Sequence, residues 1–257
     1  FAIAAFLAGS GDDLFSITSL ILCSFGIAFL HVSANVFNDY FDVKDGTDDA
    51  NTEYFNAGLN STVLEGAQLS GGSRAIELGL ISLPGTLSLA RKMLFSAFLI
   101  ASALLINTYF VTGEFSNATN ALIIGILGGL LGYFYTARPI RLASRRGLGE
   151  IAVFLAFGPL LTLGAYFAIA SSTIELFSKE FFNAICLGIP FGFLTTNILF
   201  INQFPDTVGD AKTGKNHLVV TCGKKFSRWI YLFFLVSAFI SSFFLADLFK
   251  GNLIYFN

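Results

Sequence analysis

Long uncharged segments, separated by shorter polar connections, set the pattern along this chain. Each is about 18–25 residues long, enough to cross the ~30 Å hydrocarbon core of a membrane as an α-helix. Helices are expected because lipid offers no hydrogen-bond partners to an open backbone. The segments are Leu14–Phe37, Met93–Thr112, Phe115–Ala137, Ile151–Ile174, Phe181–Pro205 and Trp229–Ala246. A further uncharged segment, Phe1–Gly9, indicates the end of another span. The pattern therefore predicts an all-α polytopic membrane bundle of six full spans and one partial span.

Composition supports a membrane protein. Hydrophobic residues make up 54% of the 257 residues and charged residues only 12%, whereas soluble domains carry about 25% charged residues. The net charge of −2 gives no sign of a nucleic-acid partner. The three cysteines lie far apart and match neither a disulfide framework nor a zinc site.

The basic residues predict the orientation in the membrane. Connections on one side of the bundle carry 13 of the 15 Lys and Arg, and only Lys179 and Lys250 fall on the other side. Connections rich in Lys and Arg tend to stay in the cytoplasm. We therefore expect an integral protein of the plasma membrane whose longer, functional connections face the cytoplasm.

A first acidic cluster follows the first full span, in the stretch NVFNDYFDVKDGTD. Asn35, Asn38, Asp39 and Asp42 have the spacing i, i+3, i+4 and i+7, so they share one face if the helix continues. Gly46 marks the expected end of that helix. A calcium EF-hand loop does not fit, because its glycine is the sixth residue and Phe41 would then be the first ligand.

A second acidic cluster closes the fifth full span, in the stretch NQFPDTVGDAKTGK. Asp206 and Asp210 have the spacing i, i+4, with Asn202 one turn earlier. Both clusters fall on the predicted cytoplasmic side, so they can converge across a bundle.

Converging carboxylates need a counter-charge, which a divalent cation provides. Mg²⁺ is usually held by one or two carboxylates together with phosphate oxygens of a substrate. Nearby cations suit a diphosphate; they are Lys44, Arg74, Arg138, Arg141, Lys212 and Lys215. The pattern favours a Mg²⁺–diphosphate site, although an acidic loop after a span is more often a solvated surface. His31 and His217 show no metal-ligand spacing.

The two acidic stretches resemble the Asp-rich motifs of the UbiA superfamily of intramembrane aromatic prenyltransferases. Asn38, Asp39 and Asp42 match the first motif, NDxxDxxxD, whose last carboxylate falls on Gly46 here, with Asp45 and Asp48 close by. Asp206 and Asp210 match the second, DxxxD. The stretches SGGSRAIELGLIS and YTARPIRLASRRGLGEIAVFLAFGPL are similar to the menaquinone branch of the family.

The resemblance implies transfer of a polyprenyl chain from an allylic diphosphate to an aromatic acceptor, with 1,4-dihydroxy-2-naphthoate expected. It implies catalytic and Mg²⁺-binding roles for Asp39, Asp42, Asp206 and Asp210, with Asn38 as a further metal ligand. It implies diphosphate binding by Asn38, Lys44, Arg74, Arg138, Arg141 and Lys212. The family fold has nine helices, so residues 1–257 are expected to form one prenyltransferase domain that is incomplete at both ends.

Two other classes stay open from the sequence. A cation-coupled transporter could use the acidic clusters, but its ionisable residues should lie within the spans, and these lie at helix ends. A non-catalytic membrane subunit could keep the same fold, but it would not need both clusters. Within the enzyme class, 4-hydroxybenzoate, homogentisate or a glycerol-phosphate lipid are alternative acceptors.

Overall fold

The structure, a computed structural model, describes residues 16–47, 73, 75–76 and 78–248. The predicted partial span Phe1–Gly9, the carboxylate of Asp48 and the guanidinium of Arg74 lie outside these residues. The expectation of nine helices also concerns segments outside them and stays a prediction.

Within the described residues the chain is all-helical, as predicted, and six of its helical segments are long and apolar enough to span a membrane. The spans are α2 (Ile17–Lys44), α5 (Leu83–Thr112), α6 (Ser116–Thr136), the pair α7 (Leu148–Phe157) and α8 (Pro159–Ile169), α9 (Lys179–Lys212) and α11 (Lys224–Leu248). Two short elements, η1 (Leu142–Ser144) and α10 (Leu218–Cys222), lie in the connections.

The helices continue past the uncharged segments on the side that carries the acidic clusters. Helix α2 ends at Lys44 rather than Phe37, and α9 ends at Lys212 rather than Pro205. Helix α5 begins ten residues before Met93, at Leu83, where the Ser82 side chain caps it. Hydropathy reports only the part of a helix that lipid surrounds, whereas capping and backbone hydrogen bonds carry the helix on into water.

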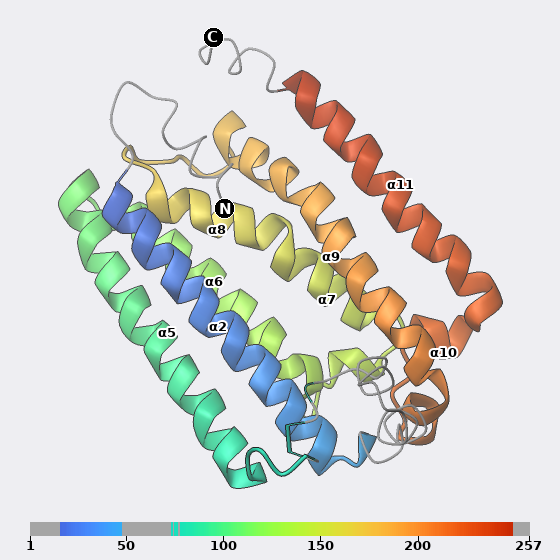
Figure 1. Ribbon diagram of the computed structural model, residues 1–257. Coiled ribbons are helices and arrows are strands. Elements are labelled where there is room, and N and C mark those ends of the chain that lie inside the picture. Colours follow the sequence, from blue (N-terminus) through green and yellow to red (C-terminus); the bar gives the residue numbers. More distant parts are fainter. Residues whose placement is uncertain (1–15, 48–72, 74, 77, 249–257) are drawn as a thin grey trace, which may run out of the picture.

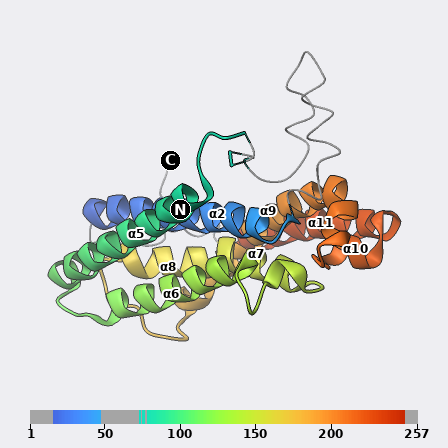
Figure 2. The ribbon, with the colours of Figure 1, turned by 90° about the horizontal axis from the view of Figure 1, so that it is seen from below.

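The broken span α7–α8 lies between α2 and α9 (Figure 1). Helix α2 packs against α5, α6 and α8, while α9 packs against α7, α8, α10 and α11. Figure 2, seen from below, shows α6 and α8 in a layer beneath α2 and α5. The C-terminal ends of α2 and α9 lie at the same end of the bundle (Figure 1). The fold thus brings both acidic clusters to one end.

A close backbone contact joins the broken span α7–α8 to α9. The break lies at Gly158, followed by Pro159 at the start of α8. A Cβ on Gly158 would lie 2.7 Å from the carbonyl oxygen of Gly188, and one on Gly192 would lie 2.7 Å from that of Phe154. Small residues allow such approach between membrane helices.

The opposite end of the bundle is closed by a packed apolar cluster. It combines residues of α8 and the following loop with Cys23 of α2 and Ala184 of α9. The fully buried Asn117 fixes that loop, since its amide donates to the carbonyl of Ser172 and its oxygen accepts from the Ile174 N–H. Apolar packing and buried hydrogen bonds therefore hold this end, whereas both acidic clusters lie at the other end.

We predict that Gly188→Ala destabilises the fold by about 1–3 kcal/mol, because its Cβ would overlap the backbone of Gly158. Thermal unfolding in detergent micelles measures the change. Gly128→Ala is the matched control, since a Cβ there meets nothing within 4 Å. Equal melting temperatures for the two variants would contradict the close contact.

Candidate active site

The first acidic cluster lies on the last turns of α2. The helix ends at Lys44, two residues before Gly46, which the sequence predicted as its end. Gly46 has a positive φ of 73°. Asn38 donates from its amide to Asp42 Oδ2 at 2.9 Å, which confirms that these two residues share a face. Asp42 is only 6% exposed. Asp39, which is partly buried, accepts a hydrogen bond from Ser73.

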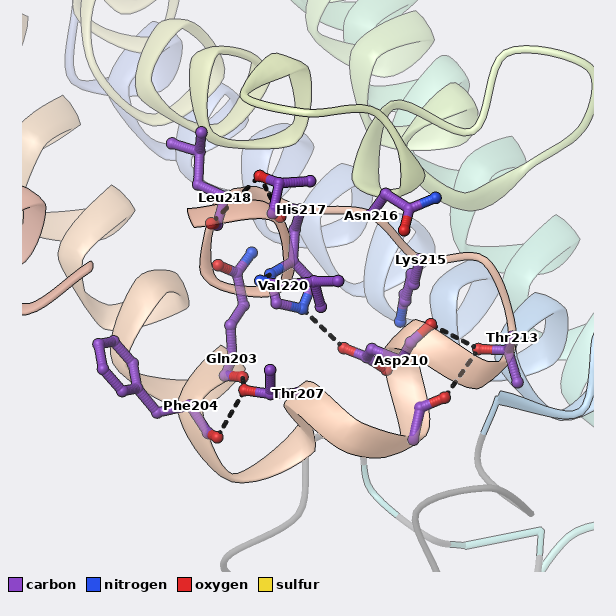
Figure 3. Close-up of polar contacts among 12 residues, drawn as sticks. Gln203, Phe204, Thr207, Asp210, Thr213, Lys215, Asn216, His217, Leu218 and Val220 are labelled. Atoms are coloured by element: carbon purple, nitrogen blue, oxygen red, sulfur yellow. Dashed lines mark hydrogen bonds and ion pairs between the residues drawn. The ribbon is translucent and has the colours of Figure 1, made fainter. Parts of the chain in front are cut away.

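The second cluster lies on the last turns of α9. Asp206 and Asp210 are both buried. Asp210 Oδ2 lies 3.0 Å from Nε2 of His217, and Figure 3 shows these two side chains facing each other across the turn that leaves α9. Asn202 is exposed, and Asn35 of the first cluster contacts His31 instead. The carboxylates, rather than these two amides, form the centre of the site.

Lys215 connects the two clusters. Its Nζ lies 2.9 Å from Asp42 Oδ2, although the two residues are 173 positions apart in the chain. Burial by itself lowers the pKa of Lys215, but the carboxylates of Asp42 and Asp210 outweigh it, so the net pKa lies above its ordinary value. Lys215 is therefore charged at neutral pH. The ammonium group of Lys215 thus interacts with carboxylates of both clusters, which converge as predicted.

The backbone around Lys215 is held at several points. The N–H of Lys215 donates to the carbonyl of Asp210 at 2.8 Å, and the N–H of Asn216 donates to the carbonyl of Ser144 at 3.2 Å. The N–H of Leu218 donates to Glu150 Oε1 at 3.1 Å. Glu150, in the first turn of α7, is 2% exposed. The turn after α9 is thus fixed to η1 and α7.

His217 caps the short helix α10. Its Nδ1 accepts from the N–H of Val220 at 3.4 Å. A ring nitrogen that accepts carries no proton, so the proton of the neutral ring lies on Nε2 and is donated to Asp210. His217 therefore orients the second carboxylate of the DxxxD motif.

The predicted cations divide into two groups. Arg138 and Arg141 lie 3.4 and 3.3 Å from the carboxylate of Asp45, so both contact the acidic region that follows α2. Lys44 is exposed, with its Nζ 5.5 Å from the centre of the Tyr40 ring, and Lys212 is exposed at the end of α9. The diphosphate-binding roles of these residues stay predictions.

The contacts of three residues, Glu150, His217 and Lys215, were not evident from the sequence. Glu150 is a single acid at the start of an apolar segment, His217 directly precedes the short apolar run LVVTC, and Lys215 is one of several lysines in its loop. Histidine is not among the usual N-cap residues, so nothing in the sequence marked His217 as a cap. Only the packing of α2, α7, α9 and α10 shows what these side chains contact.

The donor set fits Mg²⁺ bound together with a substrate. In the described part of the chain, no three His, Cys, Asp or Glu side chains are grouped closely enough to hold a metal by themselves. Mg²⁺ does not need such a cage, because one or two carboxylates and phosphate oxygens suffice. Both clusters offer hard oxygen donors, with Asn38 as a neutral one.

Comparison with known proteins gives the class. The UbiA prenyltransferase family matches residues 79–256. This chain therefore belongs to the UbiA prenyltransferase family, and its six apolar helices make it an integral membrane protein. The match includes Asp206 and Asp210, while Asp39 and Asp42 precede it.

Curated relatives are more specific at modest identity. The chain is 28% identical over 208 residues to 1,4-dihydroxy-2-naphthoate octaprenyltransferase of Haemophilus influenzae, covering 79% of this chain and 57% of that protein. It is 25% identical over 201 residues to the Bacillus subtilis protein of the same name, covering 78% and 54%. It is 36% identical over 109 residues to the chloroplastic 2-carboxy-1,4-naphthoquinone phytyltransferase of Arabidopsis thaliana, covering 42% and 28%.

The chain thus spans less than two thirds of the length of these curated relatives. No solved structure matches it significantly.

We predict that His217→Ala lowers the free energy of unfolding by about 1–3 kcal/mol, because the Val220 N–H loses its cap and Asp210 loses its ring N–H. His217→Asn keeps a capping side chain and should recover about 1 kcal/mol of that loss. Thermal unfolding in detergent micelles measures both variants. The exposed His31 supplies the control, and an equal loss in His31→Ala would contradict the role of His217.

Proposed function

We propose that this protein transfers a polyprenyl chain from an allylic polyprenyl diphosphate to 1,4-dihydroxy-2-naphthoate in quinone biosynthesis. Family membership supports the reaction class, and the names of the curated relatives support a naphthoate acceptor. The observation that carries the proposal is the meeting of two acidic helix ends, from α2 and α9, at Lys215.

The carboxylates at the ends of the two helices would hold Mg²⁺: Asp39 and Asp42 with Asn38 on α2, and Asp206 and Asp210 on α9. When bound, Mg²⁺ would neutralise the negative charge that develops on the departing diphosphate. Asn38 and His217 keep Asp42 and Asp210 oriented toward the site through the hydrogen bonds described above.

The cationic side chains would bind the diphosphate. Arg141, whose side chain is 18% exposed, is already held beside the first cluster by Asp45, while the more exposed Arg138 reaches it from the loop after α6. Their planar donor groups match phosphate oxygens. Lys44, Arg74 and Lys212 would add positive charge for the diphosphate.

The reaction then proceeds by ionisation and substitution. The C–O bond of the allylic diphosphate breaks and its electron pair leaves with the diphosphate. A ring carbon of the acceptor attacks the allylic cation. The ring regains aromaticity when that carbon releases its proton to water, or its carboxylate as CO₂, and the electron pair of the broken bond returns to the ring. Water must be excluded, because it would trap the cation.

Aromatic side chains next to the first cluster suit this step. The rings of Phe37 and Phe41 on α2 lie 5.2 and 5.9 Å from that of Tyr133 on α6, in edge-to-face contact. Aromatic faces attract cations. The prenyl tail would lie among the apolar helices, with the diphosphate at their cytoplasmic end in the plasma membrane, as the basic connections favour.

The test uses the full-length protein in detergent or lipid with radiolabelled polyprenyl diphosphate and 1,4-dihydroxy-2-naphthoate. We expect a prenylated product that requires Mg²⁺. Asp39→Ala and Asp206→Ala should each lower the transfer rate on the order of 100-fold or more, because each removes a carboxylate from the diphosphate site.

Glu175→Ala is the control, an exposed acid in the loop between α8 and α9 at the opposite end of the bundle, and it should leave the rate unchanged. Product formed only with another aromatic ring would keep the reaction and reject the naphthoate acceptor. No diphosphate release with any acceptor from folded protein would reject the enzyme and favour a transporter or a structural subunit.

A further inference from the structure

One carboxylate oxygen of the site already has two donors. Asp42 Oδ2 accepts from Asn38 Nδ2 and from Lys215 Nζ, each at 2.9 Å. The Asp42 and Lys215 side chains are only 9% and 15% exposed, so water screens this pair weakly. A divalent cation that binds this oxygen repels the ammonium group beside it. Metal binding at Asp42 Oδ2 therefore requires the Lys215 ammonium group to move.

Only the side chain of Lys215 is free to make this movement. Its backbone is fixed by the hydrogen bond to Asp210, and the next residues are fixed to Ser144 and Glu150. The four-carbon stem of lysine is flexible and ends in a compact charge. Anchored at the end of α9, the ammonium group can leave Asp42 and still remain within the site.

Without Asp42 as its partner, the displaced ammonium group of Lys215 would be poorly compensated. A charge displaced from one buried partner needs another, and the incoming diphosphate supplies oxygens of the same sign as Asp42. A neutral side chain could not make this exchange. The charge of Lys215 therefore links the occupancy of Asp42 to the presence of diphosphate.

We propose that Lys215 is an exchangeable counter-cation, which pairs with Asp42 before substrate binds and transfers to the diphosphate when the metal takes its place. This role rests on the proposed function, because it assigns the lysine to the metal–diphosphate site. Metal alone must compete with Lys215, whereas metal and diphosphate together give Lys215 a new partner. The two ligands therefore bind cooperatively.

The experiment measures Mn²⁺ binding to the purified full-length chain by electron paramagnetic resonance, with and without inorganic diphosphate. For the wild type we expect diphosphate to tighten Mn²⁺ binding about tenfold or more. Lys215→Gln should bind Mn²⁺ alone about tenfold more tightly than the wild type and should lose most of the gain from diphosphate. Unchanged or weaker binding of Mn²⁺ alone by Lys215→Gln would overturn the proposal.

Two further variants make the result specific. Lys225→Gln removes an exposed lysine at the start of α11 and should bind Mn²⁺ within about twofold of the wild type. Lys215→Arg keeps a cation and should also stay within about twofold. If Lys215→Gln does not fold even with Mn²⁺ present, Lys215→Arg decides the question. A tenfold higher affinity of Lys215→Arg for Mn²⁺ alone would contradict the proposal, because this variant keeps the positive charge that competes with the metal.

Failure of this proposal differs from failure of the proposed function. A wild type that transfers the prenyl chain, with no change in Mn²⁺ affinity in Lys215→Gln, rejects only the exchange. A wild type that neither transfers the chain nor binds Mn²⁺ with diphosphate rejects the function itself and the exchange with it.

Discussion

The arrangement of this bundle depends on the compensation of buried carboxylates by one ammonium group. Asp42 and Asp210 come from α2 and α9, which both pack against the broken span α7–α8, and both side chains lie almost out of contact with water. Two such charges repel each other strongly in a weakly polar environment. Lys215 makes their approach favourable. Its own position depends on the turn after α9, which η1 and α7 hold through backbone hydrogen bonds.

The two ends of the bundle differ in what holds them together. At one end, apolar packing and the buried Asn117 leave little freedom. At the other, charged side chains meet on helix ends that extend beyond the apolar segments. The glycine contact between the broken span and α9 connects these two regions. A rigid frame of this kind can hold charged groups in place while leaving one long side chain able to move.

Much of the fold could be predicted from hydropathy alone. The six spans were recognisable because lipid requires long uncharged segments, but their boundaries were displaced by up to ten residues, as at Leu83. Helices continue into water by capping, which hydropathy does not report. The break at Gly158 was not predicted, because Ile151–Ile174 is uncharged throughout and only the Gly-Pro pair marks it.

The candidate site was predictable only where it follows helical periodicity. Asn38 and Asp42 lie four residues apart, so their contact follows from the helix itself. Lys215 was one of several possible cations, and the roles of His217 and Glu150 were missed. Their contacts join residues from different helices, and one sequence contains no direct record of such contacts. Hydrogen bonds between distant segments become visible only with the packing.

The continuity of α2 from lipid into the site has a consequence for how the sequence can change. The membrane span and the turns that carry Asp39 and Asp42 are one uninterrupted helix, Ile17–Lys44, so the direction of each carboxylate depends on the number of residues that precede it. One inserted residue would rotate everything beyond it by about 100°. An insertion or deletion within the helix would therefore change the direction of Asp42, whereas a substitution on its exposed surface would not. The number of residues in the span therefore sets the direction in which the Asp42 side chain points.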